Sequence, residues 1–178
     1  NNNILASLFH AEADMDAGFV CSYSDILYRS SVVQRALAHP GDIVLCVDTE
    51  WRARYIDRSQ HPEDDAEKVI ADGDRIVRIE RSISSEHASG EYIGVARFND
   101  RGARALRDYY HRSRAAFAGS IWRDGTSFEK AYLIHLFQYM IEDGVDVRMV
   151  TTDGEYMEID TEEDYVLANV RWPQEYGG

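Results

Sequence analysis

Cysteine is scarce in this sequence, and long apolar runs do not occur in it. The chain has two cysteines among its 178 residues, Cys21 and Cys46. Both lie in apolar segments that read as strands, so we expect two buried free thiols in a reducing cytoplasm. The apolar runs are well short of the roughly 18 residues that a membrane-spanning helix needs. We therefore expect no membrane span.

Basic charge is also scarce. Lysine and arginine together number 19, against 32 aspartates and glutamates, and the formal net charge is -13. This balance argues against binding to nucleic acid, whose backbone requires a basic face. It leaves room for a phosphorylated small molecule, because a divalent cation can bridge carboxylates to phosphates. The length predicts one domain over residues 1–172, followed by a frayed tail at 173–178.

Strand and helix patterns alternate along the chain, which is typical of an α/β sheet. The segment 42–48, "DIVLCVD", is almost wholly apolar, as expected for a strand in a parallel sheet that is covered on both faces. Two β-rich runs flank Asp72-Gly73 and predict a hairpin over 67–80. We therefore predict a doubly wound, mostly parallel α/β sheet with a β-hairpin insertion. Helices are predicted at 1–18, 30–41, 99–117, 126–144 and 161–172.

The segment 158–164 holds five acidic side chains. Thr161 and Asp164 have the spacing of a capping box, and acidic residues in a first helical turn favour the helix dipole. A helix start alone therefore explains the acidic residues after Thr161. Asp160 precedes the cap and ends a strand, where open α/β sheets bind ligands. Asp25 follows another strand in the same way.

Several segments, taken in order, resemble those of a known family. They are "NNNILASL", "SYSDILYR", "DIVLCVDTEWRARY", "HPEDDAEKV", "GEYIGVARF" and "YMEIDTEEDY". Together they resemble the MobA-like and sugar-phosphate nucleotidyltransferases, nearest to the cytidylyltransferases of phosphocholine and of phosphonates made beside phosphoenolpyruvate mutase. The resemblance covers nearly the whole chain. It implies a doubly wound fold that binds a nucleoside triphosphate, here CTP, and a small acceptor, with Mg²⁺ aligning the phosphates and pyrophosphate leaving.

The same resemblance assigns the catalytic and metal residues. Asp25 and Asp160 match the two metal aspartates of the family, and two carboxylates suit Mg²⁺. Arg81 falls where relatives have a lysine that contacts substrate phosphate, and Glu91 lies on the strand that lines the acceptor side. Turn, helix-cap or ion-pair roles remain open for Asp25, Asp160 and Arg81.

The acceptor would be bound by residues from three further places. They are the pair Asn2 and Asn3, the loop residues Asp48, Trp51 and Tyr55, and Gly94 on the acceptor strand. If the acceptor carries an ammonium group, Trp51 and Tyr55 can supply cation–π contacts, although ordinary loop packing explains them equally well. The segment 61–69 reads as a solvated charged loop without chemistry. The six histidines show no metal-ligand spacing.

One signature of the family is missing from this sequence. We find no Gly-rich loop that contains Arg and ends in Pro-Lys, the segment that cradles the triphosphate in relatives. We therefore expect the N-terminal portion of the fold to be missing, and the chain alone to be weak or inactive unless another polypeptide supplies that segment. Two alternatives stay open: transfer to a sugar 1-phosphate, and a non-catalytic module that binds the acceptor and dimerises. Other nucleotide bases and other acceptors stay open as well, as does a homodimer.

Overall fold

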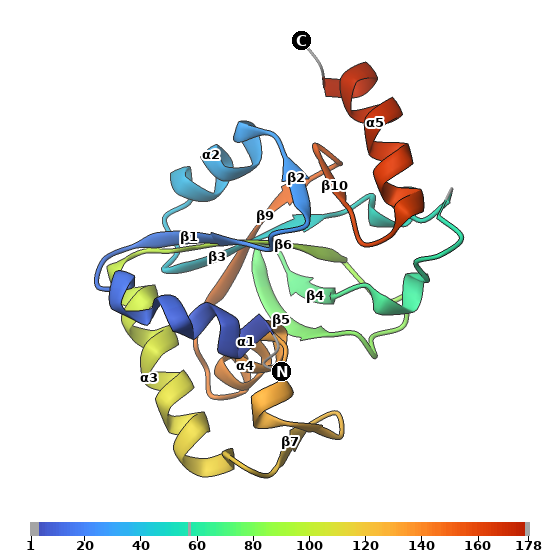
Figure 1. The fold of residues 1–178 in the computed structure, drawn as a ribbon. Helices are drawn as coiled ribbons and strands as arrows, with labels where there is room; N and C mark the ends of the chain where they lie inside the picture. The colour runs from blue at the N-terminus through green and yellow to red at the C-terminus, as the bar shows by residue number, and fades with distance from the viewer. Residues whose placement is uncertain (1–3, 57, 177–178) are drawn as a thin grey trace.

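The computed structural model describes residues 4–56 and 58–176, the side chain of residue 176 excepted. Its centre is a six-stranded sheet that helices cover on both faces (Figure 1). In spatial order the strands are β1 (Phe19–Ser22), β6 (Gly90–Phe98), β3 (Ile43–Asp48), β9 (Val147–Thr152), β5 (Arg75–Glu80) and β4 (Lys68–Asp72). The α/β class and the helices on both faces are as the sequence predicts.

The strand directions differ from the prediction of a mostly parallel sheet. Within the described residues, β3 and β9 form the only parallel pair of this sheet, and the other pairs are antiparallel. The apolar run of β3 led to the error. Every residue of β3 and of β6 is buried, and a continuous apolar run reports burial on both faces, not the direction of the neighbours.

Side chains of β3 alternate between two cores, one on each face. Ile43, Leu45 and Val47 join a large core, and Val44 and Cys46 join a smaller one. The helices lie on both sides of the sheet, with α2 on one face and α1, α3 and α4 on the other (Figure 1). They are α1 (Ile4–Leu8), α2 (Ser30–Ala38), α3 (Asp100–Phe117), α4 (Leu133–Glu142) and α5 (Glu162–Tyr176), with 3₁₀ helices at Phe9–Asp14, Trp51–Arg54, Glu63–Asp65 and Phe128–Lys130.

Several helix boundaries differ from the prediction. The first helix gives way to a 3₁₀ helix at Phe9, and α4 starts only at Leu133, because β7 (Ile121–Arg123) and β8 (Thr126–Ser127) pair before it. Asp124 and Gly125 turn that hairpin with φ of 49° and 71°. Helix α5 continues through Pro173 to Tyr176, where the sequence predicts a frayed tail.

Two features match the prediction closely. The hairpin of β4 and β5 is present, with Gly73 at a φ of 59° in its turn. The cysteines are free as predicted, although only Cys46 is fully buried and Cys21 is half-buried. Burial raises the pKa of both thiols to about 12, so neither is a ready nucleophile. None of the helices in the described ranges is long and apolar enough to cross a membrane.

A small second sheet brings the two ends of the candidate site together. Strand β2 (Ile26–Tyr28) pairs antiparallel with β10 (Tyr156–Glu158). Beyond this pair, the backbone N–H of Ile159 donates to the carbonyl of Asp25 at 2.9 Å. The turn that carries Asp25 therefore lies against the segment that carries Asp160, although the two are far apart in the sequence.

Candidate active site

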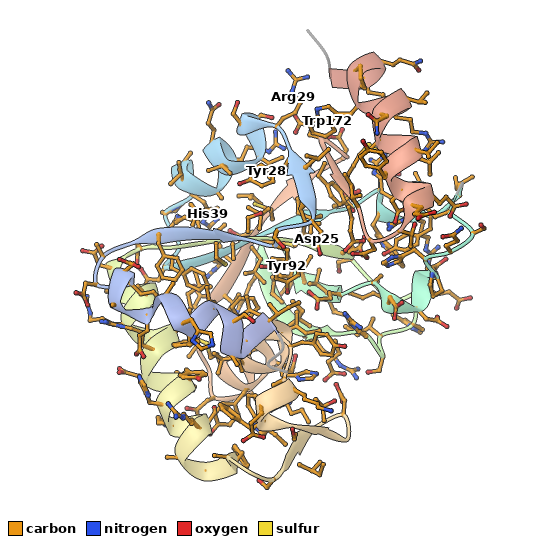
Figure 2. The ribbon with its side chains drawn as sticks, in the orientation of Figure 1. Asp25, Tyr28, Arg29, His39, Tyr92 and Trp172 are labelled. Atoms are coloured by element: carbon orange, nitrogen blue, oxygen red, sulfur yellow. The ribbon has the colours of Figure 1, made fainter. Side chains whose placement is uncertain are left out.

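A cavity of about 360 Å³ lies where this small sheet meets the main one. Six of the residues singled out in the sequence line it: Asp25, Tyr55, Arg81, Glu91, Gly94 and Asp160. A second cavity, of about 420 Å³, is lined by residues of α1 and of the segment after β1. Both cavities are lined by Ile4, Tyr23 and Asp25. Figure 2 shows Asp25 beside the junction of β1 and β2, with Tyr92 of β6 below it. Asp25 therefore stands at the boundary between two spaces.

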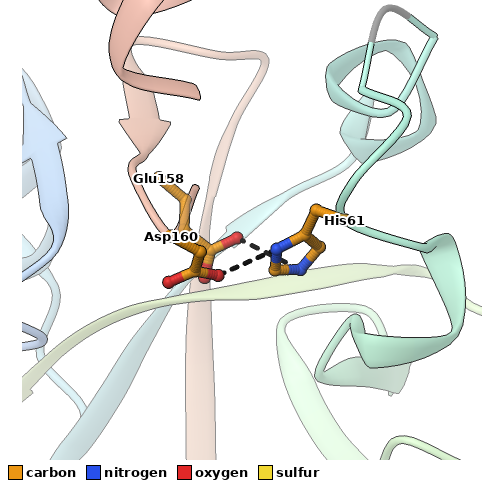
Figure 3. Close-up of side chains that lie close together, drawn as sticks. All are labelled: His61, Glu158 and Asp160. Atoms are coloured by element: carbon orange, nitrogen blue, oxygen red, sulfur yellow. Dashed lines mark ion pairs between the residues drawn. The ribbon is translucent and has the colours of Figure 1, made fainter. Parts of the chain in front are cut away.

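Acidic groups gather at one end of the smaller cavity, together with a histidine. Nδ1 of His61 lies 2.9 Å from Oδ2 of Asp160, and its Nε2 lies 3.7 Å from Oε2 of Glu158 (Figure 3). Burial raises the pKa of Asp160; His61 lowers it and the nearby charge of Asp25 raises it. Burial also raises the pKa of Glu158, and Asp160 raises it further. Carboxylates that repel one another in this way can share a cation.

The acidic residues after Thr161 do more than start a helix, which is the only role that the sequence predicts for them. The capping box is present, because the N–H of Thr161 donates to Asp164 at 2.9 Å and the N–H of Asp164 donates to Thr161 at 3.2 Å. Asp164 also accepts two hydrogen bonds from Arg58, at 2.6 and 3.0 Å. Glu163 accepts the backbone N–H groups of Ser59 and Gln60 at 2.7 and 2.9 Å. The helix start thus fastens the loop that carries His61.

Two further carboxyl groups are buried in the cavity wall. Tyr55 and Tyr156 donate their hydroxyls to Glu91 at 2.6 and 3.2 Å, and burial raises the pKa of Glu91 to about 8. Tyr23 donates to one oxygen of Glu67 at 2.9 Å. The other oxygen, Oε1, is buried without a hydrogen-bond partner in the described part of the chain. Burial raises the pKa of Glu67 to about 7, although Arg81 and Tyr23 lower it.

Arg81 and Gly94 lie where a ligand would meet them. The Arg81 guanidinium lies 4.2 Å from the ring centroid of Tyr132, and its Nη2 lies 3.7 Å from Glu67. Gly94 has a φ of 74°, and a Cβ placed on it would lie 2.5 Å from the ring of Tyr23. A glycine at this position therefore lets the Tyr23 ring pack on β6.

Other predicted acceptor residues are not brought to the cavity. Asp48 is fully buried and accepts from the N–H of Glu50 and from Arg54, so its carboxylate is occupied in starting the following turn. Trp51 is buried against Tyr55 and Ala66, because the 3₁₀ helix turns its indole into a small core. Asn2 and Asn3 lie outside the described residues.

Among the lining residues that were not predicted from the sequence are His61, Glu67 and Glu158. The first two lie in the segment 61–69, which reads as a solvated charged loop. The sequence around His61 shows no metal-ligand spacing, because the carboxylates that lie near this histidine come from β10 and the residues after it. One signal was available for Glu158, the alternation along a short strand that ends next to Asp160.

Known proteins were compared with this chain at the level of sequence and of fold. The chain matches no model of a known protein family. It is 25% identical over 142 residues to the CTP:phosphoglutamine cytidylyltransferase of Campylobacter jejuni, a match that covers 79% of this chain and 54% of that protein. The chain thus spans about half the length of the curated relative that it matches.

Solved structures share the fold. The inositol-1-phosphate CTP transferase of T. maritima superposes with a TM-score of 0.66 at 21% identity, over 91% of this chain and 57% of that one. The CTP:phosphocholine cytidylyltransferase of Streptococcus pneumoniae gives a TM-score of 0.59 at 14% identity, over 93% of this chain and 62% of that one. The chain therefore shares the fold of these nucleotidyltransferases, which agrees with the resemblance in its sequence.

Proposed function

We propose that this chain supplies the acceptor and cation sites of a cytidylyltransferase. The reaction would join an oxygen of a phosphorylated or phosphonate acceptor to the α-phosphorus of CTP, and break the bond to the β-phosphate so that pyrophosphate leaves. The observation that carries the proposal is the meeting of two cavities at Asp25, opposite Asp160. One cavity can hold the nucleotide and the other the acceptor, with their phosphates at the shared boundary. The similarity to a CTP-dependent transferase supports cytidine as the base.

The donor set at this boundary fits Mg²⁺. Asp25 and Asp160 offer carboxylate oxygens, with Glu158 beside them, and Mg²⁺ prefers a few carboxylates plus phosphate oxygens. Such a cation neutralises the charge of the phosphates that it aligns. Arg81 would bind the acceptor phosphate through its guanidinium fork, and the remaining residues hold the acceptor in position.

The buried carboxyl groups favour an acceptor that carries an ammonium group. Glu67 lines the cavity with an oxygen that receives no hydrogen bond in the described part of the chain, although Nη2 of Arg81 lies 3.7 Å from it, and Glu91 lines the same cavity. A positively charged group would pair with these carboxylates, and the ring of Tyr55 can add a cation–π contact. A sugar 1-phosphate would bring hydroxyl groups instead. We therefore place a phosphocholine-like or aminoalkylphosphonate acceptor ahead of a sugar 1-phosphate.

The non-catalytic alternative rests on the share of the relatives that this chain spans. Because it covers about half of their length, the acceptor site can serve as a binding and dimerising module of a larger assembly. A cytoplasmic location, which the two free thiols favour, and a homodimer belong to the proposal as well.

Phosphorus NMR on the chain with CTP, MgCl₂ and phosphocholine tests the proposed transfer. We expect slow, equimolar formation of pyrophosphate and of the cytidylylated acceptor, which the Asp160→Asn variant loses. If no product forms when phosphocholine saturates the chain, the proposal of a transfer reaction fails and the binding-module alternative remains. Rapid multiple turnover would instead contradict the expectation that the chain alone is weak.

A further inference from the structure

His61 lies across the two acidic side chains that follow one another on β10 and the segment after it. One nitrogen or oxygen from each of His61, Glu158 and Asp160 can be chosen so that the three atoms lie within 4.8 Å of one another. The imidazole side chain is 11% exposed, and the two carboxylates are 25% and 33% exposed. Figure 3 shows the ring facing both of them. The group is partly open to the cavity, so an ion can reach it.

The loop around His61 is held in place on both sides. Arg58 pairs with Asp164, and the next two backbone N–H groups donate to Glu163. The ring of Tyr55, whose hydroxyl donates to Glu91, lies 5.8 Å from the His61 ring, centroid to centroid. The imidazole is therefore positioned by the helix start of α5 and by the cavity wall, which is unusual for a side chain of a long charged loop.

The separation of the donor atoms suits a metal centre. A metal with bonds of about 2.0–2.2 Å to nitrogen and oxygen places neighbouring ligand atoms about 3 Å apart. Nδ1 of His61 and Oδ2 of Asp160 are 2.9 Å apart. Glu158 is in addition 3.3 Å from Arg58, which offsets part of the negative charge of the group without occupying Asp160.

We infer that His61 is a ligand of the cation site, so that the site combines one imidazole nitrogen with carboxylate oxygens. The inference rests on the cation site of the proposed function and deepens it. Imidazole suits transition metals, whereas Mg²⁺ is bound almost entirely through oxygen. A site of this composition binds Mn²⁺ more tightly than Mg²⁺, and a protein given both ions takes up Mn²⁺.

Electron paramagnetic resonance with Mn²⁺ alone tests the inference without any catalytic turnover. A titration of the wild-type chain measures the affinity, and electron spin-echo modulation detects a directly bound ¹⁴N nucleus. We expect ¹⁴N modulation in the wild type, its loss in His61→Gln, and a dissociation constant raised about tenfold or more in that variant. His39→Gln is the matched control, because His39 also pairs with an aspartate, Asp74 at 3.0 Å, and lies away from the cavity (Figure 2).

Bound Mn²⁺ without ¹⁴N modulation in the wild type overturns the inference, and this result needs no folded variant. If the Asp160→Asn variant loses this bound Mn²⁺, the cation site of the proposed function stands and only the role of His61 as a ligand is wrong. Failure of the wild type to bind Mn²⁺ at millimolar concentration also overturns it, and the transfer assay with MgCl₂ then judges the proposed function separately. Equal affinities for Mn²⁺ and Mg²⁺ contradict the inferred selectivity.

Discussion

Glu67 brings into the cavity wall a carboxyl oxygen that receives no hydrogen bond from the described residues, although Nη2 of Arg81 lies 3.7 Å from it. The Glu67 side chain is almost fully buried, and Oε1 has no hydrogen-bond partner in the described ranges. Burying a hydrogen-bond acceptor that has no hydrogen-bond partner costs about 1–3 kcal/mol. A hydrogen-bond donor on the bound acceptor substrate would remove that cost, and for this reason we propose that this oxygen binds the acceptor substrate. Glu91, by contrast, already receives two tyrosine hydroxyls.

The titration of Glu67 gives a prediction at this scale. Its pKa is raised from 4.5 to about 7 in the folded chain, so its contribution to stability is fully present below about pH 4.5 and is lost as the pH rises through 7. The Glu67→Gln variant cannot ionise. We expect its free energy of unfolding, relative to the wild type, to increase by up to about 3 kcal/mol between pH 4.5 and 8, measured by urea unfolding.

Glu80→Gln is the matched control for this measurement. Glu80 is partly buried, yet hydrogen bonds from Arg78 and Ser82 lower its pKa. The contribution of Glu80 to stability is lost only as the pH falls through its lowered pKa, below 4.5, so Glu80→Gln should differ from the wild type by a nearly constant amount between about pH 5 and 8. A Glu67→Gln curve that runs parallel to the wild type over the whole range would show that Glu67 does not titrate as the structure implies.

Single residues of the site were predictable only in part. Asp25 and Asp160 follow strands, and the resemblance pairs them, but their spacing in the sequence does not. Trp51 was assigned to the acceptor because the resemblance places its loop over the acceptor, whereas the 3₁₀ helix turns its indole into a core. Nothing local distinguishes His61 from other histidines, since its two partners come from β10 and the residues after it.

At the scale of elements, the start of α5 acts as a clamp. Asp164 accepts from Arg58 of the loop, and it also accepts the N–H groups of Asp160 and Thr161 at 3.1 and 2.9 Å. A single buried carboxylate thus connects the His61 loop with the segment that carries Asp160. Because the Arg58–Asp164 ion pair is buried, removing one of the two charges leaves the other uncompensated and destabilises the fold.

Removing the Arg58 charge tests the clamp. The side chains of Arg58 and Asp164 are 7% and 1% exposed. We expect Arg58→Met to lower the free energy of unfolding by about 3 kcal/mol in urea, because Asp164 then keeps a buried charge without its partner. Arg78→Met removes an exposed arginine that also pairs with a glutamate, Glu80, and should remain close to the wild type. Equal stabilities of the two variants would show that the clamp contributes nothing.

Elements were easier to predict than their relative directions. The β4–β5 hairpin has a local signal in Asp72-Gly73, so it was found, and the β7–β8 hairpin has a similar one in Asp124-Gly125 that the apolar helix next to it obscured. Strand order and direction depend on contacts between segments far apart in the chain. The burial of β3 and β6 on both faces is visible in their sequences, whereas their antiparallel pairing is not.

For the whole molecule, the fold places the proposed cation site between two cavities in a chain with a net charge of -13. Such a charge would repel phosphorylated ligands unless a cation intervenes. We therefore propose that acceptor binding depends on the cation, and that both depend on Asp25 and Asp160. The cavity would bind a phosphorylated acceptor with an ammonium group in a cation-dependent manner.

Thermal unfolding with phosphocholine and glucose 1-phosphate, each with and without MgCl₂, tests this claim most directly. A ligand at about 100 times its dissociation constant adds about 2.7 kcal/mol, which for a chain of this size raises Tm by roughly 5–10 °C. We predict a shift of this size for phosphocholine with MgCl₂, a smaller one for glucose 1-phosphate, and loss of the cation-dependent part in Asp160→Asn. Equal shifts for both acceptors, or a phosphocholine shift that Mg²⁺ and Asp160→Asn leave unchanged, would contradict the account.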